Sequence, residues 1–185
     1  MKIIRVSRVF HELFGEETTR LDLLAILSAA FLGTGLVLWF DFEHLRMLSF
    51  PVLMIILVLL ADILGGVVAN LTKGTASYYK ERESLRQIFI FIHVQPILFA
   101  LLIQNHVIES IFIYLYVALS ATMINSIRHL PQHKAIAMLM FMFGALMLLL
   151  FGTSMSPYVL IFFIFFMMKM IVSFACSHTH YRKNL

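Results

Sequence analysis

Six long apolar segments constrain this chain more than any other feature of its sequence. A membrane-spanning helix needs about 20 mostly apolar residues to cross a hydrocarbon layer of about 30 Å. Segments that approach this length cover about residues 23–40, 50–71, 88–103, 107–127, 135–151 and 158–176. Gly, Pro, Ser or charged residues separate them. The pattern predicts an all-α fold, a polytopic transmembrane helical bundle of about six spans in a single domain, residues 1–185.

The composition excludes an ordinary soluble domain. Hydrophobic residues make up 61% of the 185 residues and charged residues 13%, whereas a soluble domain has about 45–50% apolar and about 25% charged residues. A soluble fold of this size could not bury the excess. The net charge of +4 does not indicate nucleic-acid binding, because the basic residues flank apolar segments instead of forming one patch. The expected partner is a lipid bilayer, and the expected location is a multi-pass position in the plasma membrane.

Lysine and arginine residues predict the direction in which the chain crosses the membrane, because short loops rich in them stay in the cytoplasm. Twelve of the fourteen fall on one side of a six-span arrangement, Arg46 falls on the other, and Lys169 lies within span six. Both termini are therefore expected to be cytoplasmic. Lys169 is expected to extend to the membrane surface, because it lies about a turn and a half from the cytoplasmic end of its span.

The first 20 residues lack the apolar core and small-residue cleavage site of a signal peptide. Apolar residues recur among them at roughly helical spacing, with Lys2, Arg5 and Arg8 in between. This amphipathic segment is predicted to form a helix. The helix either lies on the bilayer surface or packs on the cytoplasmic side of the bundle.

Asp62 is the most informative polar residue inside a predicted span. It lies about eight residues from the cytoplasmic end of span two, or about 12 Å deep at about 1.5 Å per residue. An ionisable residue in a membrane costs about 2.5–3.5 kcal/mol on insertion scales, so its presence indicates either pairing with another residue or a function. Asp62, Gly66, Asn70 and Lys73 form one stripe at helical spacing, which is expected to face protein. Asp62 either handles a proton, cation or substrate, or is a buried structural carboxylate.

Spans three and four bring further polar residues to the same layer. His93 lies in span three at a depth similar to that of Asp62. Pro96 removes a helical hydrogen bond just beyond it, which is tolerated where a helix lines a cavity or meets polar partners. Asn125 and His129 share one face at the end of span four. Asp62 and His93 are the candidate catalytic residues, since either could transfer a proton.

The loop between spans two and three is basic and aromatic. Arginine forms forked hydrogen bonds with oxyanions and lysine supplies a point charge, so the loop could hold an anionic lipid or a lipid-linked substrate. Positive-inside topology and interfacial tyrosines predict the same composition without a ligand. The candidate substrate-binding residues of this loop and the adjoining span ends are Asn70, Lys73, Tyr78, Tyr79, Arg82, Arg86, Asn125, Arg128 and His129.

The sequence predicts no metal site and identifies no cofactor. His129 and His133 stand four residues apart with a proline between them, and His178 and His180 lie near the chain end, whereas catalytic zinc needs three firm protein ligands. The single cysteine, Cys176, excludes an internal disulfide. The nucleophile loop of rhomboid proteases and the aspartate-rich motif of prenyltransferases are also absent from the sequence.

These observations leave three functions open. The leading hypothesis is a membrane-embedded enzyme with a cytoplasm-facing polar cavity between spans two, three and four, which handles a polar or anionic, lipid-linked substrate. The first alternative is a transporter or permease subunit that couples a proton or cation through Asp62. The second is a non-catalytic membrane scaffold. Ala25 and Ala29 of span one have the spacing that suits docking of a partner helix or of a second copy of the chain.

Overall fold

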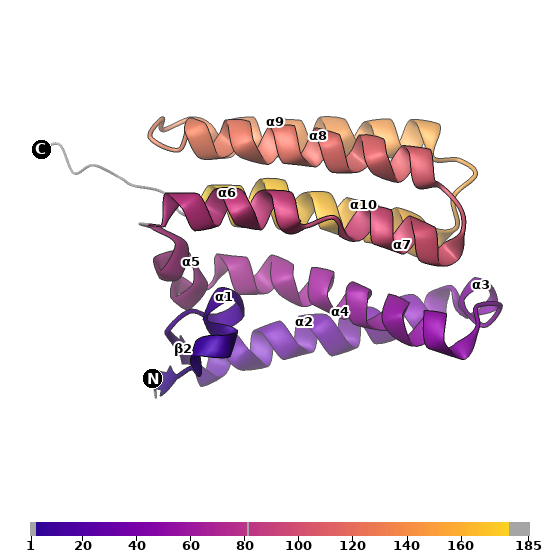
Figure 1. Ribbon diagram of the computed structural model, residues 1–185, viewed down its shortest axis with the longest axis horizontal. Helices are drawn as coiled ribbons and strands as arrows, with labels where there is room; N and C mark the ends of the chain where they lie inside the picture. Colours follow the sequence, from indigo (N-terminus) through magenta and orange to yellow (C-terminus); the bar gives the residue numbers. More distant parts are fainter. Residues whose placement is uncertain (1–2, 81, 178–185) are drawn as a thin grey trace, which may run out of the picture.

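The structure, a computed structural model, describes residues 3–80 and 82–177. It is 81% helical, and its long helices run along a common direction as a bundle (Figure 1). Within the described residues, six helical segments are long and apolar enough to cross a membrane: Arg20–Phe40, Phe50–Leu71, Glu83–Ile103, Val107–Ser126, His133–Phe151 and Pro157–Phe174. The prediction of an all-α bundle with six segments of spanning length is confirmed. The largest difference in bounds is in span three, which begins at Glu83 and not near residue 88.

Four spans are continuous helices and two are not. The continuous ones are α2 (Arg20–Phe40), α4 (Phe50–Leu71), α8 (Val107–Ser126) and α9 (His133–Phe151). Span three consists of α6 (Glu83–Ile92) and α7 (Gln95–Ile103), and span six of α10 (Pro157–Met167) and the π-helical segment η2 (Met168–Phe174), followed by α11 (Ala175–Ser177). Two short helices, α3 (Phe42–Leu45) and α5 (Lys73–Lys80), lie at opposite ends of the bundle (Figure 1).

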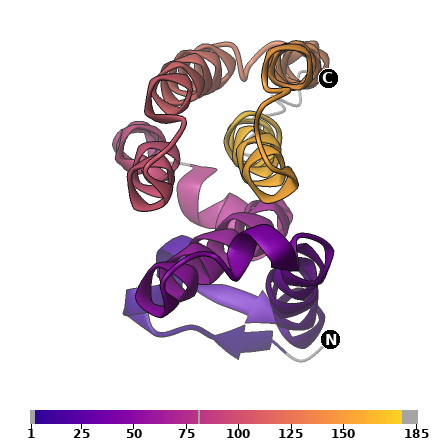
Figure 2. The same cartoon turned by 90° about the vertical axis from the view of Figure 1, so that its right-hand side faces the viewer.

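Helix α4 occupies the middle of the bundle, where it packs on α2, α7, α10 and η2. Viewed end-on, α2 and α4 lie in the lower half of the molecule and α8, α9 and α10 in the upper half (Figure 2). Small residues allow the close approach of α2 and α4, since a Cβ atom on Gly65 would lie 3.1 Å from the Cβ of Ala30. The outer faces of the spans expose large apolar side chains such as Phe31 and Leu139, as expected of surfaces that meet lipid.

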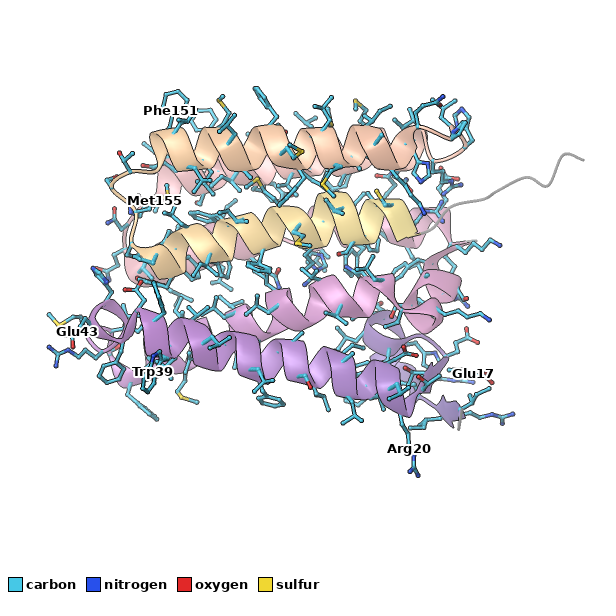
Figure 3. The ribbon with its side chains drawn as sticks, turned by 180° about the vertical axis from the view of Figure 1, so that it is seen from behind. Glu17, Arg20, Trp39, Glu43, Phe151 and Met155 are labelled. Atoms are coloured by element: carbon cyan, nitrogen blue, oxygen red, sulfur yellow. The ribbon has the colours of Figure 1, made fainter. Side chains whose placement is uncertain are left out.

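Charged side chains gather at the two ends of the bundle. Glu17 and Arg20 lie at one end of α2, and Trp39 and Glu43 lie at the other (Figure 3). At the second end, Asp41 connects α2 with α10, because its Oδ2 accepts a hydrogen bond from the backbone N–H of Tyr158 over 2.8 Å. Asp41 thereby fixes the first and last spans to each other at that end, a role that the sequence did not indicate.

The N-terminal segment forms a hairpin and not the predicted amphipathic helix. Strands β1 (Ile3–Arg5) and β2 (Glu17–Thr19) pair antiparallel, with the short helices η1 (Arg8–Phe10) and α1 (His11–Phe14) between them. The helix prediction is wrong because Gly15, at a φ of 73°, ends α1 and turns the chain into β2, where β-branched threonines favour an extended backbone. The hairpin packs on α5, and Thr75 Oγ1 donates a hydrogen bond to the carbonyl of Leu13 over 2.9 Å.

Candidate functional site

Asp62 of α4 and Lys169 of η2 form an ion pair inside the bundle. Lys169 Nζ lies 2.7 Å from Asp62 Oδ2, and the two side chains are 3% and 32% exposed. The expectation that Lys169 extends to the membrane surface is wrong, because Asp62 offers a countercharge within the bundle. Gly66 leaves space for the lysine, since a Cβ atom there would lie 2.6 Å from Lys169 Cε. The pair therefore depends on a glycine one helical turn beyond Asp62.

Gln95 is the third member of this charge centre, which we define as Asp62, Lys169 and Gln95. Its Nε2 donates to the same oxygen, Asp62 Oδ2, over 2.5 Å. Gln95 is the first residue of α7, so a side chain from the N-terminal end of that helix contacts the carboxylate. Gln95 Oε1 is buried and accepts no hydrogen bond from any described residue.

Span three is interrupted immediately before Gln95. His93 ends α6 with φ −78° and ψ 59°, and Pro96 stands in the first turn of α7, so the helical hydrogen bond that Pro96 removes lies at a break between two helices. Backbone carbonyls near the break obtain other donors, as they must in a membrane. These bonds join Phe89 O to His93 Nδ1 (2.5 Å), Phe91 O to Tyr114 Oη (2.9 Å) and Ile92 O to Val94 N (2.8 Å).

Span six departs from α-helical geometry at the same centre. The π-helical segment begins at Met168, one residue before Lys169, and π-helical turns inside α-helices are frequent at functional sites. The carbonyl of Lys169 accepts hydrogen bonds from Ser173 Oγ at 2.7 Å and from Asn70 Nδ2 at 3.4 Å. Asn70, predicted to share a stripe with Asp62, therefore contacts the backbone of the lysine that Asp62 binds.

His93 stands beside the charge centre without bonding to it. The described residues include no hydrogen bond or ion pair between His93 and Asp62. The imidazole Nδ1–H donates to the Phe89 carbonyl, and the two rings lie 3.9 Å apart between centroids. Gln95, and not His93, is thus the side chain of span three that contacts Asp62.

Arg86 and Asn125 form a second, separate cluster. Arg86 is 1% exposed, and its Nε donates to Asn125 Oδ1 over 2.9 Å. Its Nη1 donates to the carbonyls of Tyr79 and Lys80 at 2.5 and 2.8 Å, so Arg86 caps the C-terminal end of α5. Burial raises the pKa of the Tyr79 phenol above its ordinary value. These predicted binding residues join α5, α6 and α8.

Two further predicted binding residues lie at the turn after α8. Arg128 Nη2 lies 3.6 Å from Glu83 Oε2 at the start of α6, and His129 is exposed. No group of three or more His, Cys, Asp or Glu residues in the described part of the chain is placed to hold a metal ion. The predicted pair His178 and His180 lies outside the described residues.

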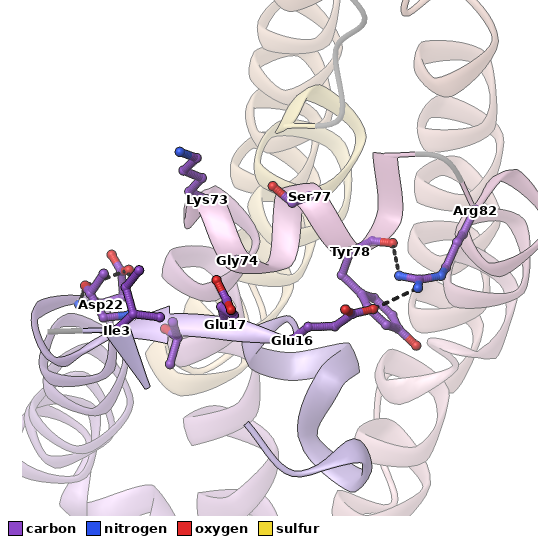
Figure 4. Close-up of a pocket in the computed structure, with 11 residues that line it drawn as sticks. Ile3, Glu16, Glu17, Asp22, Lys73, Gly74, Ser77, Tyr78 and Arg82 are labelled. Atoms are coloured by element: carbon purple, nitrogen blue, oxygen red, sulfur yellow. Dashed lines mark hydrogen bonds and ion pairs between the residues drawn. The ribbon is translucent and has the colours of Figure 1, made fainter. Parts of the chain in front are cut away.

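The remaining predicted residues, Lys73, Tyr78 and Arg82, line a cavity of about 780 Å³ between the N-terminal hairpin and α5 (Figure 4). Its other lining residues are Ile3, Glu16, Glu17, Thr18, Thr19, Asp22, Gly74 and Ser77. Asp62 and His93 do not line it. The residues expected to converge on one cavity between spans two, three and four are therefore distributed over separate places.

Lys169 and Gln95 are the members of the charge centre that the sequence patterns did not indicate. The signal for Lys169 was present, because Lys169 and Asp62 lie at similar depths from the cytoplasmic ends of their spans. Opposite charges at one depth of a bilayer are candidates for pairing.

Comparison with models of protein families finds no match for the chain, and comparisons with curated proteins and with solved structures find none either.

Proposed function

We propose that the protein is an integral membrane transport protein in which Asp62 and Lys169 bind the coupling proton and the transported solute. One observation carries this proposal: the ion pair lies where span three is broken and span six becomes π-helical. Discontinuous helices near the middle of the membrane are typical of the binding sites of secondary transporters. Ionisable groups at that depth mark ion and substrate pathways.

The geometry of the pair supports proton coupling. Lys169 and Gln95 both donate to Asp62 Oδ2, which leaves Oδ1 as the oxygen that can accept a proton. Protonation would remove the charge that holds Lys169, and the freed ammonium would attract an anionic group. Loss of the proton would restore the ion pair and release the anion. The centre therefore has two arrangements: in one, Asp62 pairs with Lys169, and in the other, Asp62 is protonated and Lys169 binds the anion. Joint binding of a proton and an anion would shift the equilibrium from the first arrangement to the second.

The coupling test uses a variant in which both charges are removed together. In Asp62→Asn/Lys169→Gln protein, polar side chains of similar size remain, so the bundle should fold while proton binding is lost. Wild-type proteoliposomes with an internal pH-sensitive dye are expected to acidify when some members of a panel of small organic anions are added outside. The double variant should lower that rate to the level of protein-free liposomes, because no group is left at the centre to bind the coupled proton.

The matched control is Glu43→Gln, which removes an exposed carboxylate at the end of the bundle opposite to the N-terminal hairpin. It should leave the acidification rate unchanged. Anion-driven acidification, or uptake of a labelled anion, that persists in the folded double variant would contradict the proposal. No acidification by wild type with any anion would contradict it equally.

A membrane enzyme acting on a lipid-linked substrate has less support. It requires Asp62 and His93 to act on one substrate, but they share no bond in the described residues and His93 Nδ1 is occupied by the Phe89 carbonyl. A scaffold explains the ion pair as a link between helices, yet it does not explain why two spans lose regular helical geometry at that place. The coupling test separates these alternatives, because neither predicts anion-driven proton entry.

We further propose that the end of the bundle that carries the N-terminal hairpin and α5 faces the cytoplasm of the plasma membrane. Most lysine and arginine residues flank the span ends on that side, and Arg46 lies at the other end. In intact cells, a membrane-impermeant maleimide should label a Glu43→Cys variant and leave a Lys80→Cys variant unlabelled until the cells are opened. The reverse pattern would contradict this orientation.

A further inference from the structure

We propose that the cavity between the N-terminal hairpin and α5 binds the headgroup of an ethanolamine-type phospholipid, which carries a primary ammonium and a phosphate. This site is distinct from the charge centre, since Asp62, Lys169 and Gln95 do not line the cavity. The hairpin and the start of α2 form one wall and α5 forms the other (Figure 4). A volume of about 780 Å³ is sufficient for a polar headgroup.

Charge in the cavity favours a ligand with a cationic group. Arg82 is already neutralised, because its Nη2 lies 2.9 Å from Glu16 Oε1 and its guanidinium covers the Tyr78 ring at 4.2 Å. The charged side chains that remain are Glu17, Asp22 and Lys73. Two carboxylates and one ammonium leave an excess of negative charge, so the anionic headgroup expected from the basic loop is disfavoured.

The three remaining charged groups are open to a ligand. Asp22 uses Oδ2 to accept hydrogen bonds from Thr19, which leaves Oδ1 free for another donor. In the ranges that the structure covers, neither Glu17 nor Lys73 takes part in an ion pair. Figure 4 shows the acidic side chains on the hairpin wall and Lys73 with Ser77 on the α5 wall. A primary ammonium could donate to Glu17 and Asp22 while Lys73 and Ser77 bind the phosphate.

The position of the cavity indicates a lipid as the source of the ligand. Asp22 lies in the first turn of α2, and Lys73 stands two residues after the end of α4. Both lining walls therefore stand where spans leave the hydrocarbon layer, at the level of lipid headgroups. A phospholipid in the adjacent leaflet could place its headgroup in the cavity while its acyl chains stay in the bilayer.

Lipid binding can be measured by the shift in thermal unfolding of the purified protein in detergent micelles. Phosphatidylethanolamine is expected to bind about tenfold more tightly than phosphatidylcholine, whose trimethylammonium group cannot donate hydrogen bonds, and than phosphatidylglycerol, which has no cation. Glu17→Gln and Lys73→Gln should each weaken phosphatidylethanolamine binding by about tenfold. The two variants report on opposite walls, so failure of one to fold leaves the other as a test.

Glu43→Gln again serves as the control, because Glu43 lies at the opposite end of the bundle (Figure 3). Equal binding of the three lipids would overturn the proposal, as would unchanged phosphatidylethanolamine binding in folded Glu17→Gln and Lys73→Gln proteins. Binding of soluble phosphoethanolamine, measured in the same way, distinguishes a lipid headgroup from a free metabolite that carries the same ammonium and phosphate groups. If phosphoethanolamine bound as tightly as the lipid, the ligand would be a free metabolite and the assignment to a lipid would be wrong.

Discussion

Replacement of Lys169 by glutamine is expected to destabilise the bundle by about 3–5 kcal/mol, the cost of removing one partner of a buried ion pair. The ammonium is 3% exposed and lies 2.7 Å from Asp62 Oδ2. Without it, the carboxylate would retain the Gln95 amide but no countercharge. The free energy of unfolding, measured in mixed micelles by titration with a denaturing detergent, provides the test.

The double variant Asp62→Asn/Lys169→Gln should recover most of that loss, because it leaves no uncompensated charge in the bundle. Lys134→Gln is the matched control, since Lys134 is exposed at the start of α9 and its replacement should change stability by less than about 0.5 kcal/mol. A double variant no more stable than Lys169→Gln would show that the two charges do not interact as the geometry requires.

The number and extent of the spans could be predicted from the sequence because they depend on one strong physical constraint. Hydrocarbon accepts only segments whose backbone is internally hydrogen-bonded and whose side chains are apolar. That constraint acts on each segment separately, so α2, α4, α8 and α9 were visible without tertiary information. The break in span three was only partly indicated, because Pro96 predicted the loss of one helical hydrogen bond and not the end of α6 at Ile92.

The charge centre was only half predictable, because helix pairing is decided between segments distant in sequence. Asp62 stood out through its depth in span two. Lys169 was assigned to the surface, because a lysine stem can reach the interface from that depth. Whether Lys169 extends to the surface or to Asp62 depends on Gly66, which has no side chain and so leaves room for the lysine. Such space exists only once α4 and η2 pack against each other.

The separation of the other predicted residues has a similar cause. Helical spacing identified which residues share a face of one helix. It did not identify which groups of neighbouring segments, such as backbone carbonyls, that face would contact. Arg86 is directed to the end of α5, and its bonds to the Tyr79 and Lys80 carbonyls depend on how the chain turns between two helices. The hairpin was missed because its apolar residues also fit a helical period, and Gly15 alone marked the turn.

Gly15→Ala is expected to release the N-terminal hairpin from α5. Gly15 adopts φ 73° and ψ −177°, a backbone region essentially restricted to glycine, in which another residue costs about 1–3 kcal/mol. An added Cβ atom would also lie 2.2 Å from the backbone carbon and oxygen of Gly74. Backbone atoms of α5 cannot move aside as a flexible side chain could, so the strain should be relieved by undocking.

A cysteine at position 18 can report the release of the hairpin, because Thr18 is 3% exposed and its hydroxyl has no hydrogen-bond partner among the described residues. Maleimide should modify the Thr18→Cys reporter slowly in the parent protein and quickly after Gly15→Ala. Gly35→Ala is the matched control, since nothing lies within 4 Å of the added Cβ atom. An unchanged labelling rate in the Gly15→Ala protein would mean that the hairpin is not held by this contact. Because the hairpin forms a wall of the cavity and not of the charge centre, release should abolish phosphatidylethanolamine binding while leaving anion-driven proton entry intact.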